Sequence, residues 1–383
     1  MAYIQKRGKS YTITVSCGYD IHGRQVRKSK TFTPDSKMTA KQLERALQRE
    51  AVLFEEECGN SLCEGGNVKF EAFAEQWFEE YAAAHLKTRT ISLYRSMKKR
   101  VYAGIGHIRL DKVATRTIQR FIHDLCKTMA PKTAQNYFSF ISGVFSYAVS
   151  QGMISTNPCK GVKLPPVGTR ERACYTLEEA QAFLAALQTE PMHWRIYYIL
   201  AIFGGFRRGE LLGLEWKDID FETGVISIRR TSLYTPEHGV FTDTPKTARS
   251  VRSLKMTNDV MDELRRYRIE QNKERLKVGD KWQDSDRLFT TWNGAPLNPS
   301  CVENWLSRFF DRTDLRKVNP HSFRHLNASL LISCGTDVRT VSAALGHSQT
   351  STTLNIYAHS FEEAQAKATA AISESLSLKI LAK

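Results

Sequence analysis

The sequence predicts a multidomain protein that is mainly α-helical and contains small antiparallel sheets. Its length of 383 residues is typical of two or three domains. Hydrophobic residues make up 42% of the chain, which is enough for each domain to bury a core. Apolar residues recur mostly at helical spacing, and strand-like alternation is confined to the N-terminus and to one stretch of the C-terminal half.

The first 60 residues predict a three-stranded sheet followed by one helix. Apolar and polar residues alternate over residues 11–17, which is the period of a half-buried strand. The other elements expected here are a turn, a return strand, a helix and a polar, glycine-rich linker, at residues 20–23, 25–32, 39–57 and 61–67.

Residues 68–163 predict a helical bundle. Aromatic and aliphatic residues recur at helical spacing in three stripes, at residues 70–81, 118–125 and 137–148. The opposite faces of these helices are rich in lysine and arginine. We therefore expect one domain with an apolar core and a basic exterior.

The remainder predicts a connector, a mostly helical domain with a small antiparallel sheet, and a tail. The connector, residues 164–173, is rich in proline, glycine and arginine. In the domain at 174–360, Thr176 and Glu179 have the spacing of a capping box, and two alternating stretches predict strands around a hairpin. The tail, residues 361–383, has helix-forming composition and apolar anchors.

The chain is strongly basic, with 55 Lys and Arg against 40 Asp and Glu and a net charge of +15. Residues 86–163 alone hold fourteen basic residues and two acidic ones, whereas residues 174–383 are nearly balanced. Such a distribution predicts a polyanionic partner. No apolar run approaches the ~18 residues that span a bilayer, and the N-terminus has no apolar signal segment. We therefore expect a cytoplasmic protein that binds nucleic acid and no membrane.

The eight cysteines predict no metal site. None of them forms a C-x-x-C pair, and only Cys58 and Cys63 lie close together, whereas structural zinc usually needs two tight pairs. Free thiols in a reducing compartment are the expected state.

Four short motifs in the C-terminal half carry residues suited to act on a phosphate. They are G-F-R-R-G-E at 205–210, T-P-K-T at 244–247, P-H-S-F-R at 320–324 and L-G-H at 345–347, with Tyr357 ten residues after the histidine. Each motif alone has an ordinary structural explanation, such as an Arg–Glu pair at a helix start or a glycine helix cap. Their combination and order indicate chemistry.

Together the motifs resemble those of the tyrosine recombinase, or phage-type integrase, family, and most closely those of integrases of conjugative transposons of Gram-positive bacteria. The family's catalytic residues fall on Arg207, Lys246, His321, Arg324, His347 and Tyr357. The resemblance implies a catalytic domain of the DNA breaking-rejoining type at 174–360, a core-binding domain at 68–163 and an arm-type DNA-binding domain at 1–60. Ser322 and Asn327 depart from the family's usual residues beside the catalytic positions.

The residue types in these motifs suit phosphoryl transfer without a metal or other cofactor. A phosphodiester under attack gains negative charge on its non-bridging oxygens, and fixed cations stabilise that charge. Arg207 and Arg324 present planar donors that stay protonated, and His347 would donate to a non-bridging oxygen. Arg208 is the rival to Arg207. The G-x-R-x-x-E spacing favours Arg207, with Glu210 orienting it.

Tyr357 is the expected nucleophile, which would give a 3′-phosphotyrosine and a free 5′-hydroxyl. His321 would take the phenol proton, and Lys246 would protonate the leaving 5′-oxygen, with Lys255 as a second candidate. The phosphotyrosyl bond conserves the phosphoester energy, so rejoining needs no ATP.

DNA contacts are expected in both N-terminal domains. Phosphate contacts of the bundle are assigned to Lys87, Arg89, Lys98, Lys99 and Lys132. The N-terminal strands are expected to enter a major groove with Arg24, Arg27, Lys28 and Lys30. The tail at 361–383 would dock on a neighbouring protomer and give a homo-tetramer on two DNA duplexes, assisted by an accessory protein for DNA bending or excision.

Three alternatives remain at this point. A type IB-like topoisomerase uses similar active-site groups but relaxes supercoils without paired sites. A catalytically silent DNA-binding regulator would keep the fold, although the six family positions are complete. A metal-dependent nuclease would need an acidic ligand cluster near the histidines, which the sequence lacks.

Overall fold

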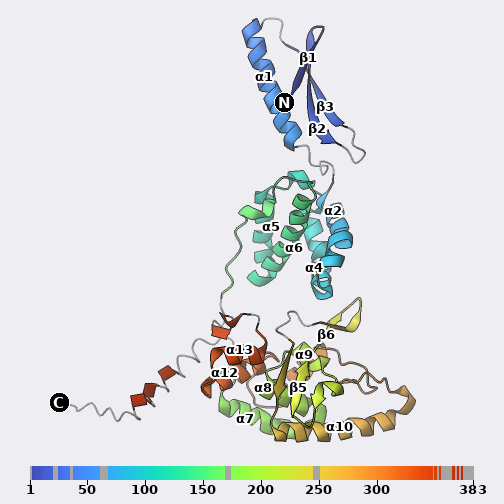
Figure 1. The fold of residues 1–383 in the computed structure, drawn as a ribbon, viewed down its shortest axis with the longest axis vertical. Coiled ribbons are helices and arrows are strands. Elements are labelled where there is room, and N and C mark those ends of the chain that lie inside the picture. Colours follow the sequence, from blue (N-terminus) through green and yellow to red (C-terminus); the bar gives the residue numbers. More distant parts are fainter. Residues whose placement is uncertain are drawn as a thin grey trace, which may run out of the picture. The chain divides into compact units, whose positions relative to one another are not determined.

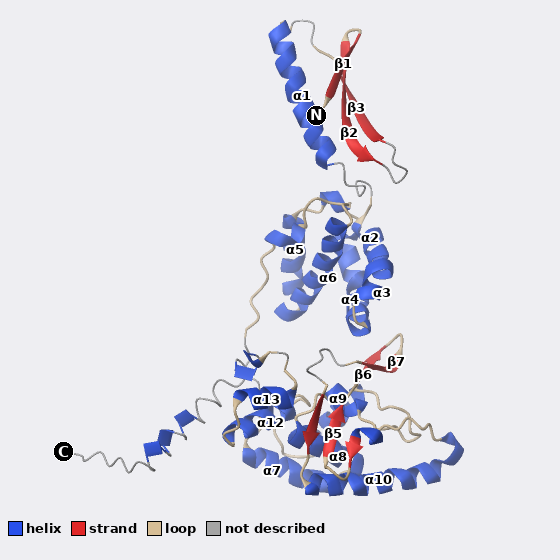
Figure 2. Cartoon of the chain, viewed as in Figure 1, coloured by secondary structure: helices blue, strands red, loops and turns tan. Residues whose placement is uncertain are grey.

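The structure of the chain, a computed structural model, is shown in Figure 1. It describes the chain apart from residues 1, 20–24, 35–37, 61–67, 169–173, 245–250, 348, 352, 355–364, 367–368, 371 and 374–383. It consists of two compact units, Met1–Thr169 and Arg170–Lys383. Helices dominate, and the sheets of the described residues are small and antiparallel, so the predicted fold class is confirmed (Figure 2).

The N-terminal sheet has the strand order β1-β2-β3, and one helix covers one of its faces (Figure 1). The elements are β1 (Tyr3–Arg7), β2 (Ser10–Tyr19), β3 (Gln25–Phe32) and α1 (Ala40–Asn60). Ile13 and Val15 of β2 pack with Ala51 and Phe54 of α1, as the alternation predicts. The turn expected at 20–23 and the linker expected at 61–67 lie outside the described residues.

The helical part of the first unit has its own apolar core. Its helices are α2 (Phe70–Trp77), η2 (Phe78–Ala82), α3 (Ala83–His85), α4 (Thr88–Val101), η3 (Tyr102–Gly106), η4 (Leu110–Lys112), α5 (Thr115–Cys126), α6 (Pro131–Ser150) and η5 (Pro158–Gly161). All three predicted stripes contribute to the core, for example through Trp77, Ile122 and Phe145. Two of the helical turns, η2 and η3, are π-helical and continue α2 and α4 without a break.

In the second unit, other helices and, among the described residues, two small sheets pack around a buried helix, α8 (Figure 1). Its helices are α7 (Leu177–Ala186), η6 (Leu187–Thr189), α8 (Met192–Gly204), α9 (Arg208–Gly213), η7 (Trp216–Asp218), α10 (Asn258–Val278), η9 (Gly279–Lys281), α11 (Ser300–Asp311), α12 (Ser322–Ser333) and α13 (Val338–Leu345). Its strands are β4 (Ile219–Asp220), β5 (Val225–Ile228), β6 (Thr231–Thr235), β7 (Gly239–Asp243) and β8 (Arg252–Lys255). Thr176 and Glu179 form the predicted capping box at the start of α7.

The hairpin β6–β7 is seated directly on α9. Gly209 and Gly213 lie one turn apart on this helix, and a Cβ at either position would come within 2.9 Å of a backbone oxygen, that of Ser232 or Arg230. Only glycine permits this approach of strand backbone to helix. The hairpin is therefore held against the helix whose first turn follows Arg207.

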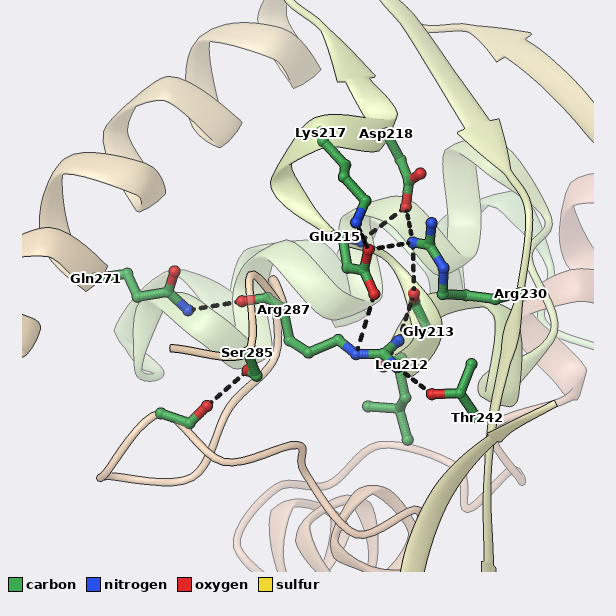
Figure 3. A network of polar contacts seen from close by, with 11 residues as sticks. Leu212, Gly213, Glu215, Lys217, Asp218, Arg230, Thr242, Gln271, Ser285 and Arg287 are labelled. Atoms are coloured by element: carbon green, nitrogen blue, oxygen red, sulfur yellow. Dashed lines mark hydrogen bonds and ion pairs between the residues drawn. The ribbon is translucent and has the colours of Figure 1, made fainter. Parts of the chain in front are cut away.

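A buried polar network ties the C-terminal end of α9 to the same hairpin, as Figure 3 shows. The Arg287 guanidinium, in a side chain that is 6% exposed, donates to the Gly213 carbonyl and to the Thr242 hydroxyl of β7. Arg230 pairs with Glu215 and with Asp218 beside it. Arginine is suited to this place because its planar fork serves several acceptors at once.

We predict that Arg287→Leu lowers the free energy of unfolding of this unit by about 3 kcal/mol, because it leaves buried acceptors without their donor. Urea unfolding followed by tryptophan fluorescence measures the change. Lys273→Ala, which removes the exposed pair with Glu270, serves as the control and should leave the transition unchanged. Equal transitions for wild type and Arg287→Leu would contradict the prediction.

Candidate active site

Three arginines converge on successive carbonyls at the C-terminal end of α13. Arg252 donates through Nε to the Ala344 carbonyl at 2.6 Å, Arg324 donates to the Leu345 carbonyl, and Arg207 donates to the Gly346 carbonyl at 2.9 Å. A helix leaves its last carbonyls without intrahelical donors and carries partial negative charge there, so it attracts cations. This helix end therefore gathers three guanidinium groups at one place.

A glycine makes these carbonyls available. Gly346 ends α13 in the left-handed region with φ +65°. Its N–H donates to the Ala343 carbonyl, and the N–H of His347 donates to the Ser342 carbonyl, which is the Schellman arrangement. The backbone thus closes the helix on earlier carbonyls and leaves the last three to the arginines.

The end of α8 receives donors from α12 in a similar way. Gly205 ends α8 with φ +57°, and Arg324 donates to its carbonyl at 2.7 Å. Asn327 donates to the carbonyls of Ile202 and Phe203 at 2.8 and 3.0 Å. A Cβ at position 205 would lie 2.5 Å from the Asn327 side-chain oxygen, so no larger residue fits beside it. The departure from the family pattern at Asn327 thus has a structural role.

Glu210 joins two of the three arginines. Its carboxylate, in a residue that is 2% exposed, accepts from the Arg207 guanidinium at 2.6 Å and from the Arg207 backbone N–H at 2.9 Å. It also accepts two bonds from Arg252, at 3.2 and 3.0 Å. Burial raises the pKa of Glu210, but the two guanidinium groups outweigh burial, so the pKa lies below its usual range. The carboxylate therefore stays ionised and holds both cations.

His347 follows directly after this helix end. Its Nδ1 lies 2.8 Å from the hydroxyl oxygen of Thr353. Burial lowers the pKa of His347 to about 4, with further lowering by Arg324, Arg207, Arg252 and His321. The imidazole is therefore neutral at pH 7 and carries a single N–H.

His321 is the N-cap of α12 and is exposed. The Asn319 side chain accepts from the backbone N–H groups of His321 and Ser322 at 2.9 and 3.1 Å, which fixes the helix start. The His321 ring meets the edge of the His325 ring with centroids 4.8 Å apart. An exposed imidazole at this place is accessible to a proton donor.

Most of the residues predicted from the motifs lie at this helix end. Arg207, Glu210, Arg324 and His347 contact one another or the same turn, and the charge of His321 acts on His347. Lys246 and Tyr357 lie outside the described residues. The rival Arg208 instead pairs with Glu303 of α11, and Lys255 is exposed at the end of β8.

Sequence reasoning overlooked two side chains of the site. Arg252 lies on the inward face of β8, the face it shares with Leu254, and no local sequence pattern identifies its role there. Thr353 is fully buried. In the sequence it lies between His347 and Tyr357, the expected nucleophile. No local pattern distinguishes this threonine from its neighbours.

The residues proposed for DNA contact in the bundle differ in their surroundings. Lys98 is paired with Glu75 and lies over the rings of Phe78 and Tyr102, so its ammonium is already engaged within the domain. The other side chains are exposed, namely Lys87, Arg89, Lys99 and Lys132.

In the N-terminal sheet, register decides which face each basic residue occupies. Lys28 and Lys30 stand opposite Val15 and Ile13, which lie on the face covered by α1, and Lys30 pairs with Glu50 of that helix. Arg27 stands opposite Ser16, on the other face. Arg24 lies outside the described residues.

Within the described part of the chain, no helix is long and apolar enough to cross a membrane. No group of three or more His, Cys, Asp and Glu side chains in these residues is placed to hold a metal ion. The cysteines that the structure describes as free thiols are Cys126, Cys159, Cys174, Cys301 and Cys334.

Family models match the sequence of both units. The model described as "Phage integrase family" matches residues 174–364, and the model of the phage integrase central domain matches residues 70–164. The chain belongs to the phage integrase family. It is accordingly a tyrosine recombinase of the integrase type.

Relatives and solved structures extend the likeness over most of this recombinase. A XerC-like tyrosine recombinase of Caldanaerobacter subterraneus is 28% identical, and the ICEBs1 integrase of Bacillus subtilis is 26% identical; each match covers 93% of this chain and 94% of the relative. The Tn1549 transposon integrase, solved with a circular intermediate DNA, has a TM-score of 0.66 at 21% identity and covers 79% of this chain and 99% of its own. A lambda integrase tetramer bound to a Holliday junction has a TM-score of 0.56 at 18% identity, covering 91% and 96%. At these identities the solved structures establish the fold.

We predict that Arg252→Met lowers the free energy of unfolding of the catalytic unit by about 3–5 kcal/mol, because Glu210 stays buried with one cation fewer. Urea unfolding measures this effect. Adding Glu210→Gln to Arg252→Met should cost less than the sum of the two single changes, since the pair shares one interaction. Additive losses would contradict the proposed coupling.

The lowered pKa of His347 predicts a loss of stability in acid. The unfolded imidazole binds a proton near pH 6.5, whereas the folded one does so only near pH 4. The unfolded state therefore binds more protons between these values, and the free energy of unfolding should fall as the pH drops from 6.5 to 4. Unfolding measured across this range should show a smaller fall in His347→Gln than in the wild type. Parallel curves would contradict the prediction.

Proposed function

We propose that this protein is a site-specific DNA recombinase that cuts and rejoins DNA through a 3′-phosphotyrosine intermediate to integrate and excise a mobile element. The observation that carries the proposal is the cluster of Arg207, Arg324 and His347 around one helix end, in a chain whose sequence places Tyr357 ten residues after that histidine. The names of the relatives, an integrase and a tyrosine recombinase among them, support it.

The arginines would stabilise the pentacoordinate phosphorus. Arg207 is held by Glu210 and Gly346 while 36% of its side chain stays exposed, so donors remain for a phosphate oxygen. Arg324, which is nearly fully buried, would supply a fixed positive charge from within the protein. The carbonyls at the end of α13 already orient both guanidinium groups. Little reorganisation therefore accompanies the reaction, which is the condition for strong electrostatic catalysis.

Bond making and breaking would involve Tyr357 and Lys246. The phenolic oxygen of Tyr357 forms a bond to phosphorus, the bond from phosphorus to the 5′-oxygen breaks, and Lys246 gives that oxygen a proton. His321 accepts the phenol proton, and His347 donates to a non-bridging oxygen. In rejoining, a 5′-hydroxyl attacks the phosphotyrosine and the same proton transfers run in reverse.

The remaining segments would bind DNA and assemble protomers. The proposed parts are an arm-binding domain, a linker, a core-binding domain, an interdomain linker, a catalytic domain and a docking tail, at residues 1–60, 61–67, 68–163, 164–173, 174–360 and 361–383. The solved relatives bound to DNA, and the lambda tetramer on a Holliday junction, support double-stranded DNA as partner and a homo-tetramer on two duplexes as the active assembly. An accessory protein would bend the DNA or direct excision, and the recombinase would act in the cytoplasm, on the nucleoid.

The surroundings of each basic side chain distinguish stronger from weaker candidates for DNA contact. Lys87, Arg89, Lys99 and Lys132 are the stronger candidates in the bundle because their side chains are exposed, whereas Lys98 is half-buried and bound to Glu75. On the sheet, Arg27 lies on the face that α1 leaves uncovered, so it is a stronger candidate for groove contacts than Lys28 and Lys30.

We predict that wild-type protein forms an SDS-resistant adduct with a nicked duplex bearing the element's end, because loss of the short strand prevents rejoining. Tyr357→Phe should form none, and Arg207→Ala should form the adduct at least about 100-fold more slowly. Denaturing gels with 5′- and 3′-labelled strands identify the end to which the protein is joined.

The same assay separates the alternatives. EDTA should leave adduct formation unchanged, whereas it would abolish cleavage by a metal-dependent nuclease. Relaxation of supercoiled plasmid lacking element ends would favour a topoisomerase. DNA binding without any adduct would favour a catalytically silent regulator and overturn the proposal.

A further inference from the structure

Thr353 is fully buried, and its hydroxyl has a polar partner in the active site. The Oγ1 atom lies 2.8 Å from Nδ1 of His347, six residues earlier. Both atoms can donate or accept a hydrogen bond, and the distance is that of a well-formed one. The direction of this hydrogen bond therefore decides what the other ring nitrogen, Nε2, can do.

A neutral imidazole has one N–H, on either Nδ1 or Nε2. His347 is neutral at pH 7, because burial and the surrounding cations lower its pKa to about 4. If the Thr353 hydroxyl donates to Nδ1, the proton sits on Nε2 and that nitrogen can donate to a phosphate oxygen. If the hydroxyl accepts from Nδ1, Nε2 has only a lone pair to present, which an anionic oxygen repels.

We propose that Thr353 is a positioning residue that donates to Nδ1 of His347 and so keeps the proton on Nε2, where it binds a non-bridging oxygen of the scissile phosphate. This inference rests on the proposed function. Burial and the three arginines at the end of α13 keep the ring neutral, because both disfavour a second proton on it. The hydroxyl selects between the two neutral forms, and the arginines exclude the doubly protonated one.

The test compares Thr353→Val, which has nearly the same shape but no hydroxyl, with Thr353→Ser, which keeps it. Single-turnover adduct formation on the nicked duplex at saturating DNA isolates the chemical step. We expect Thr353→Val to react about 10- to 100-fold more slowly, the range found when an outer hydrogen-bond partner of a histidine is removed from metal sites. Thr353→Ser should stay within about 3-fold of wild type, and DNA affinity should be unchanged in both.

A double-mutant cycle with His347→Ala distinguishes positioning from general structural support. Without the imidazole, Thr353→Val should cause no further loss of rate, whereas a structural role would cause the same loss in either background. Thr353→Ala repeats the cycle with a second hydroxyl-free side chain, and thermal unfolding reports whether each variant is folded.

The outcomes separate this inference from the proposed function. Wild-type rates in Thr353→Val, equal losses in the valine and serine variants, or a full further loss in the His347→Ala background would each overturn the role of Thr353. Those results would leave the Tyr357-dependent adduct intact. Absence of that adduct in the wild type would instead overturn the proposed function.

Discussion

The last carbonyls of α13 set the geometry on which the active site depends. Arg252, Arg324 and Arg207 each donate to one of three successive carbonyls, although they come from β8, α12 and the start of α9. Three like charges so close together repel one another. The negative end of the helix and the ionised Glu210 offset this repulsion, so the cations are fixed before any phosphate arrives.

The arginines bound at this helix end have different roles. Arg252 is 7% exposed and uses its fork on Glu210 and Ala344, so it supports the site from within the protein. Arg207 binds the same carboxylate yet stays partly exposed. The packing of β6 on α9 and the Arg287 network hold the other end of that helix. A short helix of little intrinsic stability is thereby fixed at both ends by tertiary contacts.

Much of this could be predicted from the sequence, because the signals are local. Alternation identified the N-terminal strands, and helical periodicity identified the three stripes of the bundle core. The motifs identified Arg207, Glu210, His321, Arg324 and His347 as members of one site. This was possible because the motif spacing of a family reflects contacts in the folded protein, whereas composition does not. The contribution of Arg252 was not predictable in this way, because its partners lie 42 and 92 residues away. For the same reason the sequence did not show that Lys98 and Lys30, two candidates for DNA contact, pair with Glu75 of α2 and Glu50 of α1.

The termination of α13 by Gly346 has a consequence for how such a chain tolerates change in length. Each added residue turns a helix end by ~100° and advances it by ~1.5 Å. One insertion within α13 would therefore carry all three carbonyls away from their arginines together, although no contacting side chain had been altered. The number of residues in α13 is therefore more constrained than their identity.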